Sequence, residues 1–259
     1  MDSGVRQNDG VGGESFAVNV PGARAVFLGF PKVIAMFINA DFSQAACVVP
    51  DQHCWVASPQ SGVARVMLDR VGDEVARATS LVRYAPASVF PPHAHGAGEE
   101  ILVLSGTFSD ESGDFGAGWY VRNPPGSRHQ PLSREGALIF VKLRQMPADE
   151  AQTVRVDSNR AQAWQCDSDG VAVCPLFASA YEQVCLRRLP RAQVWVDANE
   201  SGLELLVLSG TLQVNEHRLP QHSWLRLPAG VGARCFAEQE DVVFYIKTNH
   251  LKDVIGVHP

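Results

Sequence analysis

The chain has 259 residues, of which 46% are hydrophobic and 19% charged, and its 22 Lys and Arg against 28 Asp and Glu give a formal net charge of −6. This composition is typical of a globular protein with one large or two medium domains, and it excludes a disordered chain. The acidic balance, without any run of basic residues, argues against binding to nucleic acid.

Residues 1–36 are expected to form an N-terminal extension that is partly disordered, because the opening residues are polar and rich in glycine. No basic segment precedes an apolar core there, so no signal peptide is predicted. The apolar stretch 25–38 is interrupted by Pro31 and Lys32 and is too short to span a bilayer. We therefore expect no association with a membrane.

The cysteines are scattered, without a CxxC pair or zinc-ribbon spacing. In a chain of this size they are expected to be reduced and mostly buried thiols, which predicts a cytoplasmic location. The six are Cys47, Cys54, Cys166, Cys174, Cys185 and Cys235.

Short runs of Val, Ile, Leu, Phe and Tyr are separated by Gly, Pro, Asn and Asp along the whole chain, which predicts β-strands and no long helix. The residues 110–114 are typical of a hairpin turn, and 124–126 of a tight bend. The fold class is therefore predicted to be all-β. The clearest strands are expected at residues 78–84, 100–104, 119–122, 137–143, 204–208, 224–227 and 242–247.

The sequence repeats itself at an offset of 104 residues. Residues 100–107 (EILVLSGT) align with 204–211 (ELLVLSGT), and Arg122 aligns with Arg226. The register holds without a gap from Pro86 to Phe140. We expect two copies of one unit, at 37–147 and 148–259, joined by a linker near 146–162. Two small jelly-roll barrels in tandem would satisfy both the composition and the repeat.

The first copy contains an H-x-H-x3-E motif formed by His93, His95 and Glu99, and a G-x5-P-x-G-x2-H motif that ends at His129. Residues i and i+2 of a strand point to the same face, so His93 and His95 can reach one ion together. A bend at residues 96–98 would return Glu99 beside them. Three imidazoles and a carboxylate suit Zn, Fe(II), Mn, Ni or Co without choosing among them.

The second copy lacks this ligand set. His93, His95, Glu99 and His129 align with Asp197, Asn199, Leu203 and Ala233. We interpret the second copy as a degenerate, metal-free unit that is kept for structure or assembly. Its histidines do not fall on ligand positions and are expected to be exposed or capping residues; they are His217, His222, His250 and His258.

The two motifs resemble the two cupin motifs, and residues 78–86, 98–111 and 122–127 resemble the ChrR-like cupins. That group includes the cupin domain of zinc-binding ChrR anti-sigma factors and iron-dependent dioxygenases that cleave acetylacetone. The resemblance implies a tandem cupin, or bicupin, with His93, His95, Glu99 and His129 as ligands of one divalent metal ion. Two positions depart from the general cupin pattern: Ala87 replaces the usual Gly of the first motif, and Ser133 the usual Asn of the second.

Three functions are compatible with this site. An Fe(II) ion with open positions could bind a β-diketone or related small molecule and activate O2, so the chain would be a metal-dependent dioxygenase. A zinc ion closed by four protein ligands would instead favour a regulatory or sensor cupin without catalysis. A third reading is a metal-stabilised storage or scaffold protein. The H-x3-C-x2-C motif of the anti-sigma zinc domain is absent from the sequence, so binding to a sigma factor is not expected.

Tyr84, Tyr120 and Arg122 come from predicted strands near the motifs and are candidates to contact a ligand. Ordinary barrel packing, with a surface ion pair at Arg122, is the alternative that we favour. Glu100 is expected to point away from the metal, because its counterpart Glu204 persists where no metal site does. Exposed edges of two open barrels also predict a homodimer.

Overall fold

The computed structural model describes residues 36–73, 75–197 and 201–257. Most of the predicted N-terminal extension, together with His258 and Asn199, lies outside the described residues. Strands account for 53% of the described residues and helix for 3%, the latter in two 3-10 turns, η1 (Pro50–Gln52) and η2 (Ala161–Ala163). The all-β prediction is confirmed. No helix in the described residues is both long and apolar enough to cross a bilayer.

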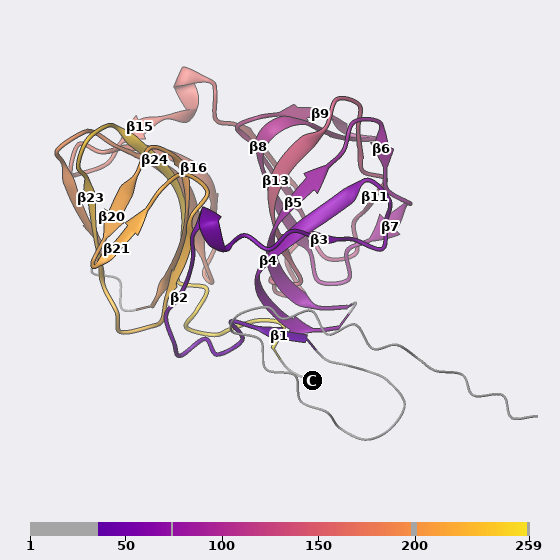
Figure 1. Ribbon diagram of the computed structural model, residues 1–259, viewed down its shortest axis with the longest axis horizontal. Helices are drawn as coiled ribbons and strands as arrows, with labels where there is room; N and C mark the ends of the chain where they lie inside the picture. Colours follow the sequence, from indigo (N-terminus) through magenta and orange to yellow (C-terminus); the bar gives the residue numbers. More distant parts are fainter. Residues whose placement is uncertain (1–35, 74, 198–200, 258–259) are drawn as a thin grey trace, which may run out of the picture.

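The strands form two barrels that lie side by side, with the amino-terminal half of the chain on the right of Figure 1. The first barrel consists of one large sheet, with the path β1-β4-β5-β13-β8-β10-β14, and a small ladder of β7 and β11. Its strands are β1 (Met36–Ile38), β3 (Val56–Ala57), β4 (Val63–Gly72), β5 (Arg77–Tyr84), β6 (Ser88–Val89), β7 (His93–Ala94), β8 (Glu99–Asp110), β9 (Gly113–Gly116), β10 (Trp119–Asn123), β11 (Arg128–His129), β12 (Leu132–Ser133), β13 (Ala137–Leu143) and β14 (Val154–Asp157).

The second barrel repeats this plan with the path β15-β16-β17-β24-β19-β22-β2 and a four-stranded sheet β18-β23-β20-β21. Its strands are β2 (Ala46–Val48), β15 (Gln165–Cys166), β16 (Ala172–Ala178), β17 (Gln183–Leu189), β18 (Val194–Asp197), β19 (Leu203–Ser209), β20 (Leu212–Val214), β21 (His217–Leu219), β22 (Trp224–Leu227), β23 (Ala233–Ala237) and β24 (Val242–Thr248). The tandem cupin architecture predicted from the repeat is confirmed.

The two copies exchange strands. β2, which lies between β1 and β3 in the sequence, pairs with β22 of the second barrel, with Cys47 opposite Leu225. β14, which lies in the segment predicted to begin the second unit, pairs with β10 of the first barrel, with Val156 opposite Tyr120. The predicted division at residues 147 and 148 therefore does not separate the two sheets, because each barrel borrows an edge strand from the segment that leads into the other.

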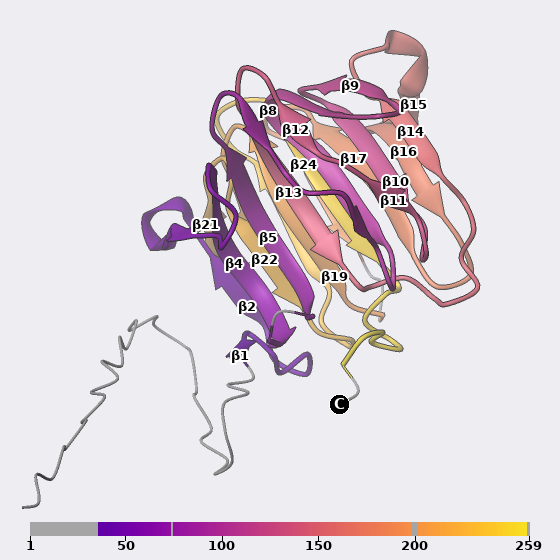
Figure 2. The ribbon, with the colours of Figure 1, turned by 90° about the vertical axis from the view of Figure 1, so that its right-hand side faces the viewer.

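Strand alternation divides the apolar residues into three layers. Ile101, Val103 and Val121 point into the first barrel, and Leu205, Val207 and Phe244 point into the second. The residues between them in sequence point outward and form a third cluster between the two large sheets; it includes Leu102, Tyr120, Phe140, Leu206, Trp224 and Tyr245. Figure 2 shows the two sheets stacked face to face.

Charged side chains are buried within this interface in a reciprocal arrangement. Lys142 of β13 contacts Glu204 of β19, with Nζ 2.6 Å from the carboxylate. Lys247 of β24 contacts Glu100 of β8 at 2.8 Å. Each lysine therefore pairs with the glutamate of the other barrel, and all four side chains are at most 4% exposed. The prediction that Glu100 points away from the metal ligands is confirmed.

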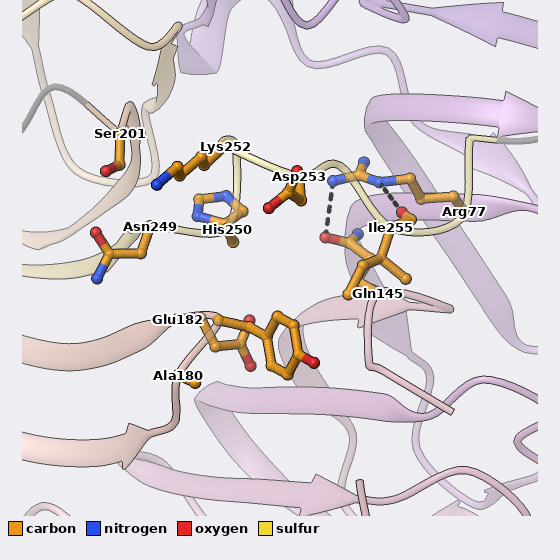
Figure 3. A pocket seen from close by; sticks show the side chains of 11 residues that line it. Arg77, Gln145, Ala180, Glu182, Ser201, Asn249, His250, Lys252, Asp253 and Ile255 are labelled. Carbon is orange, nitrogen blue, oxygen red and sulfur yellow. Dashed lines mark hydrogen bonds between the residues drawn. The ribbon is translucent and has the colours of Figure 1, made fainter. Parts of the chain in front are cut away.

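A polar cavity of about 380 Å³ lies at one end of this interface (Figure 3). Arg77 forms part of its lining and donates to Gln145 and to the carbonyl oxygen of Ile255. His250 lines the same cavity, and its Nε2 lies 3.2 Å from Glu204. The side chain of His250 is only 6% exposed. The expectation that this histidine is exposed or capping is wrong, because the interface buries it against a carboxylate.

Candidate metal centre

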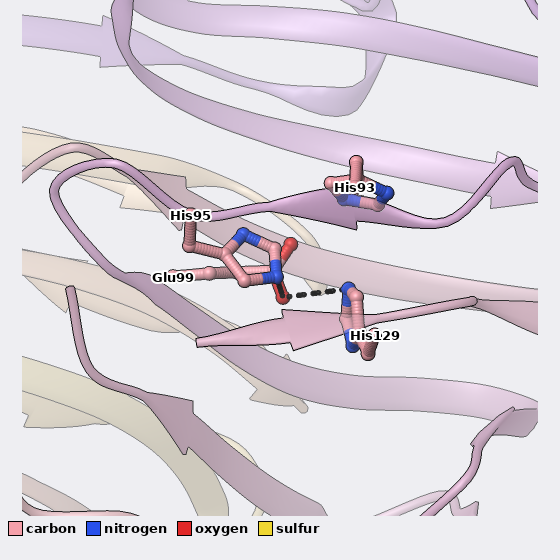
Figure 4. A group of neighbouring side chains, drawn as sticks. All are labelled: His93, His95, Glu99 and His129. Atoms are coloured by element: carbon pink, nitrogen blue, oxygen red, sulfur yellow. Dashed lines mark ion pairs between the residues drawn. The ribbon is translucent and has the colours of Figure 1, made fainter. Parts of the chain in front are cut away.

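The four residues of the two sequence motifs meet at one end of the first barrel (Figure 4). His93 lies on β7 and His129 on β11, and the antiparallel pairing of these strands places the two residues directly opposite each other. His95 follows β7, and Glu99 is the first residue of β8. One ligand atom from each residue lies within 4.8 Å of every other. The cluster could therefore hold one metal ion.

The carboxylate of Glu99 lies close to two of the three histidines. Its Oε2 lies 3.4 Å from Nε2 of His95 and 3.4 Å from Nε2 of His129. Both nitrogens are buried and lack a hydrogen-bond partner. A buried polar atom without a partner is costly, and a metal ion between these atoms would satisfy both nitrogens at once.

The bend that brings Glu99 back to the histidines depends on Gly98, which adopts a positive φ of 81°. A Cβ at this position would collide with the side chain of Met146. The backbone carbonyl of Gly98 accepts a hydrogen bond from the amide of Arg144 at 3.0 Å. Only glycine combines this backbone conformation with the close approach of Met146, so the loop geometry predicted from the sequence has a clear physical basis.

Hydrogen bonds on the far side of the imidazole rings orient two of the histidines. Nδ1 of His93 lies 3.0 Å from the carbonyl oxygen of Pro91, and Nδ1 of His129 lies 3.1 Å from Oδ2 of Asp110. A neutral ring that donates through Nδ1 presents an unprotonated Nε2 to a metal. The carboxylate of Asp110 is only 2% exposed. The sequence analysis missed this residue, whose position in a hairpin gave no sign of its contact.

Glu99 is held by a second chain of contacts. Asn123 donates from Nδ2 to Glu99 at 3.2 Å, and Arg155 donates from Nη2 to the side-chain oxygen of Asn123 at 2.7 Å. Arg155 lies on β14, the strand that follows the first sequence unit. The support of Glu99 therefore extends into the exchanged strand, a relationship that spacing along the chain could not reveal.

The electrostatics of the cluster differ between its histidines. Burial lowers the pKa of His95. Burial also acts on His129, but its hydrogen bond to the Asp110 carboxylate and the charge of Glu99 outweigh it and raise the pKa of this imidazole. Burial raises the pKa of Asp110, yet its hydrogen bonds with His129 and Ser112 prevail and hold the value at about 2. Asp110 is therefore a permanent anion beside His129 at neutral pH.

The second barrel keeps the geometry of the site without its ligands. Asp197 on β18 pairs with Ala233 on β23, as His93 pairs with His129. Leu203 and Ala233 are buried in the apolar interior of this barrel. Among the described residues, the His93, His95, Glu99 and His129 cluster is the group of side chains placed to share an ion.

A cavity of about 350 Å³ opens beside the cluster, and His93, His95 and Glu99 form part of its wall. Most of the remaining wall is apolar. Two arginines, Arg65 and Arg144, also line the cavity, and neither was selected from the sequence. The other side chains that shape it include Val63, Val82, Tyr84, Phe90, Ile139, Val141 and Leu143.

Of the three residues that the sequence suggested as ligand contacts, the structure places one at the cavity and two in the interface between the barrels. Tyr84 lines the cavity, where burial raises the pKa of its phenol so that it stays protonated. Tyr120 and Arg122 lie on the opposite face of β10 from Val121 and point into the interface between the barrels. Arg122 pairs with Glu182 at 2.6 Å and is fully buried, so the expectation of a surface ion pair is wrong.

Comparison with known proteins agrees with this geometry. Residues 43–147 match the family model described as the ChrR cupin-like domain. No curated protein matches the sequence significantly. The chain thus has the fold of a tandem cupin, and its residues 43–147, which include most of the first barrel, are similar to the ChrR cupin-like domain.

Solved structures share the fold at low sequence identity. A candidate dioxygenase from Nostoc punctiforme is 16% identical, with 92% of this chain and 91% of that chain covered and a TM-score of 0.66. A candidate glyoxylate-induced protein from Pseudomonas aeruginosa is 14% identical, with 92% and 97% covered and a TM-score of 0.65. A bacterial pirin from Escherichia coli, in complex with nickel(II), is 13% identical, with 79% and 99% covered and a TM-score of 0.60.

Proposed function

We propose that the chain binds one divalent metal ion through His93, His95, Glu99 and His129 and uses it as an Fe(II)-dependent dioxygenase of small molecules that chelate through two oxygens. The observation that carries this proposal is the cavity of about 350 Å³ beside the buried ligand cluster. A purely structural metal site is closed by its ligands, whereas this cluster forms one wall of a space that a small molecule could enter.

Each residue of the site has a defined task in this proposal. The three imidazoles and Glu99 would hold the ion, and Asp110 and Asn123 would keep His129 and Glu99 oriented. Bound Fe(II) would supply Lewis acidity and reactivity toward O2. The apolar walls formed by residues such as Val82 exclude water from the reacting centre. Tyr84, protonated and buried, can donate a hydrogen bond to a ligand oxygen.

Oxygen uptake tests the proposal. The protein is loaded with Fe(II) or with Zn(II) and mixed with a panel of β-diketones, and O2 consumption is followed with an electrode. We expect uptake that requires both a diketone and Fe(II), and that is lost in His129→Ala. Tight binding of Zn(II) without O2 uptake under any loading would instead support a zinc-binding regulatory cupin.

The six cysteines form no disulfide, which supports a reducing, cytoplasmic setting for either activity.

A further inference from the structure

Two positively charged side chains, which the proposed chelation does not use, line the cavity beside the metal ligands. Arg65 and Arg144 both line it, and Glu99 is the only carboxylate of the described residues in its wall. The carboxylates of Glu99 and, behind His129, Asp110 would offset a divalent ion, so the two guanidinium groups remain without a further compensating carboxylate in the described part of the cavity wall. An uncompensated cationic cavity favours an anionic ligand.

Arg65 points into this space because of its place on β4. It follows Val63 by two residues, so the two side chains share a face, and Val63 belongs to the interior cluster of the first barrel. Val66, on the other face, packs in the interface between the barrels. Nε of Arg65 is buried without a hydrogen-bond partner, and within the described chain no ion pair neutralises this guanidinium.

Arg144 approaches the cavity from the end of β13, close to the metal ligands. Its Nη1 lies about 3.1 Å from the position that a Cβ of Gly96 would take, in the loop between His95 and Glu99. The residue adopts a positive φ of 59°, a conformation that is strained for an arginine. Over the described residues, its side chain also takes part in no ion pair.

Arg65 and Arg144 are half-buried, and holding guanidinium groups near a dication is unfavourable unless an anion compensates them. We infer that the substrate carries a second anionic group, a carboxylate separated from the chelating oxygens by a short apolar chain, and that Arg65 and Arg144 bind this carboxylate. Apolar side chains make up most of the remaining cavity wall and could accommodate such a chain. This inference rests on the proposed function and specifies its substrate as an oxo acid.

A matched pair of ligands tests the inference. One is 5,7-dioxooctanoate, and the other is its N-methylamide, which keeps the β-diketone and removes the charge. Binding of each to the Fe(II)-loaded protein is measured by titration calorimetry under argon, where the absence of O2 prevents turnover. We expect the carboxylate to bind at least about tenfold more tightly than the amide, an effect typical of a charged hydrogen bond in a partly buried site.

Variants assign this preference to the two arginines. Arg65→Met, Arg144→Met and the double variant should reduce the preference toward unity, and Arg65→Lys should keep part of it. Arg134→Met, at an exposed ion pair with Asp114, serves as the control and should keep the full preference. Iron content and thermal melting of each variant show that the site and fold are intact.

The outcomes separate the two proposals. Equal affinity for the carboxylate and the amide, or a preference that survives in the double variant, would overturn the inference while leaving the dioxygenase proposal in place. If neither compound binds to the Fe(II)-loaded protein, the chelation on which both depend is wrong. A preference for the carboxylate that the native chain shows and the arginine variants lose supports the inference, whether or not O2 is consumed.

Discussion

Lys142 of the first barrel places its ammonium nitrogen 2.6 Å from both carboxylate oxygens of Glu204 in the second barrel, and neither side chain is exposed to solvent. The repeat generates the reciprocal pair of Lys247 and Glu100. Glu100 and Glu204 were aligned from the sequence, but the exchange of partners between the barrels depends on how the sheets stack. These pairs make the second barrel part of the structure that supports the first.

Removing the charge of Lys142 should therefore destabilise the whole chain. In Lys142→Met, Glu204 remains buried with Trp224 and His250 as its remaining partners. Breaking a buried ion pair by removing one partner costs about 3–5 kcal/mol, and urea unfolding should show a loss near the lower end of that range. Arg134→Met, which removes an exposed ion pair, is the control. Equal unfolding midpoints for the two variants would contradict this account of the interface.

The interface also predicts loss of stability in acid. Burial lowers the pKa of His250 from 6.5 to about 4, so the unfolded chain takes up a proton between these values that the folded chain does not. Burial raises the pKa of Glu100, but Lys247 and Arg122 outweigh it and lower the value from 4.5 to about 2. The free energy of unfolding should fall as the pH drops from 6.5 to 4 and fall further below 4.5.

His250→Gln isolates the upper part of this dependence. The variant should lose the slope between pH 6.5 and 4 that His250 contributes and keep the slope below 4.5. Unfolding of both proteins is followed by fluorescence at several pH values. A variant with the same pH dependence as the native chain would show that His250 does not carry this effect.

Asp110 should control metal affinity without contacting the metal. Asp110→Asn keeps the shape of the side chain but removes the charge that faces Nδ1 of His129. Loss of such an outer carboxylate typically weakens metal binding by about 10- to 100-fold. Asp114→Asn, in an exposed position on the same hairpin, is the matched control. Competition with a chromophoric chelator measures both affinities, and indistinguishable values would refute a role for Asp110.

The exchanged strand should contribute to the site through Arg155. Arg155→Gln removes the donor that fixes Asn123, which in turn contacts Glu99. We expect weaker metal binding with little change in melting temperature, because Arg155 is partly exposed. Arg160→Gln on the following turn lies at the surface and should bind metal normally. Native metal affinity in Arg155→Gln would contradict a role of the exchanged strand in supporting Glu99.

Ala87 offers a test of backbone strain. It has a positive φ of 59° at the place where the cupin motif usually has glycine. The left-handed conformation costs a residue with a Cβ about 1–2 kcal/mol, whereas glycine loses more entropy on folding. Ala87→Gly should therefore leave stability unchanged or raise it by up to about 1 kcal/mol in thermal melts, while Ala85→Gly should lower it. A destabilised Ala87→Gly would contradict the strain argument.

Much of the fold could be predicted from the sequence because strands have short-range signatures. Alternating residues, turn glycines and an unbroken offset of 104 residues defined two β units, and the pairing of Asp197 with Ala233 reproduces that of His93 with His129. The four candidate ligands also come from local motifs. Each of these features depends on residues close in the chain or on an exact repeat.

The features that escaped prediction depend on how distant segments pack. β2 and β14 join the sheets of the opposite copies, and no local pattern specifies which edge a strand will cover. Arg122 looks like a surface residue in the sequence, yet the stacking of the sheets buries it against Glu182. Arg65 and Arg144 line the same cavity only once the barrel closes, so neither their spacing nor their sequence neighbours could identify them.

The most direct test of the central claim is the metal content of the purified protein after reconstitution, measured by plasma mass spectrometry for the native chain and His129→Ala. The account predicts about one divalent ion per native chain and a large loss of that ion in the variant, with circular dichroism showing that both are folded. A native chain without bound metal after reconstitution, or a variant that retains a full equivalent, would contradict the assignment of His93, His95, Glu99 and His129 as a metal centre.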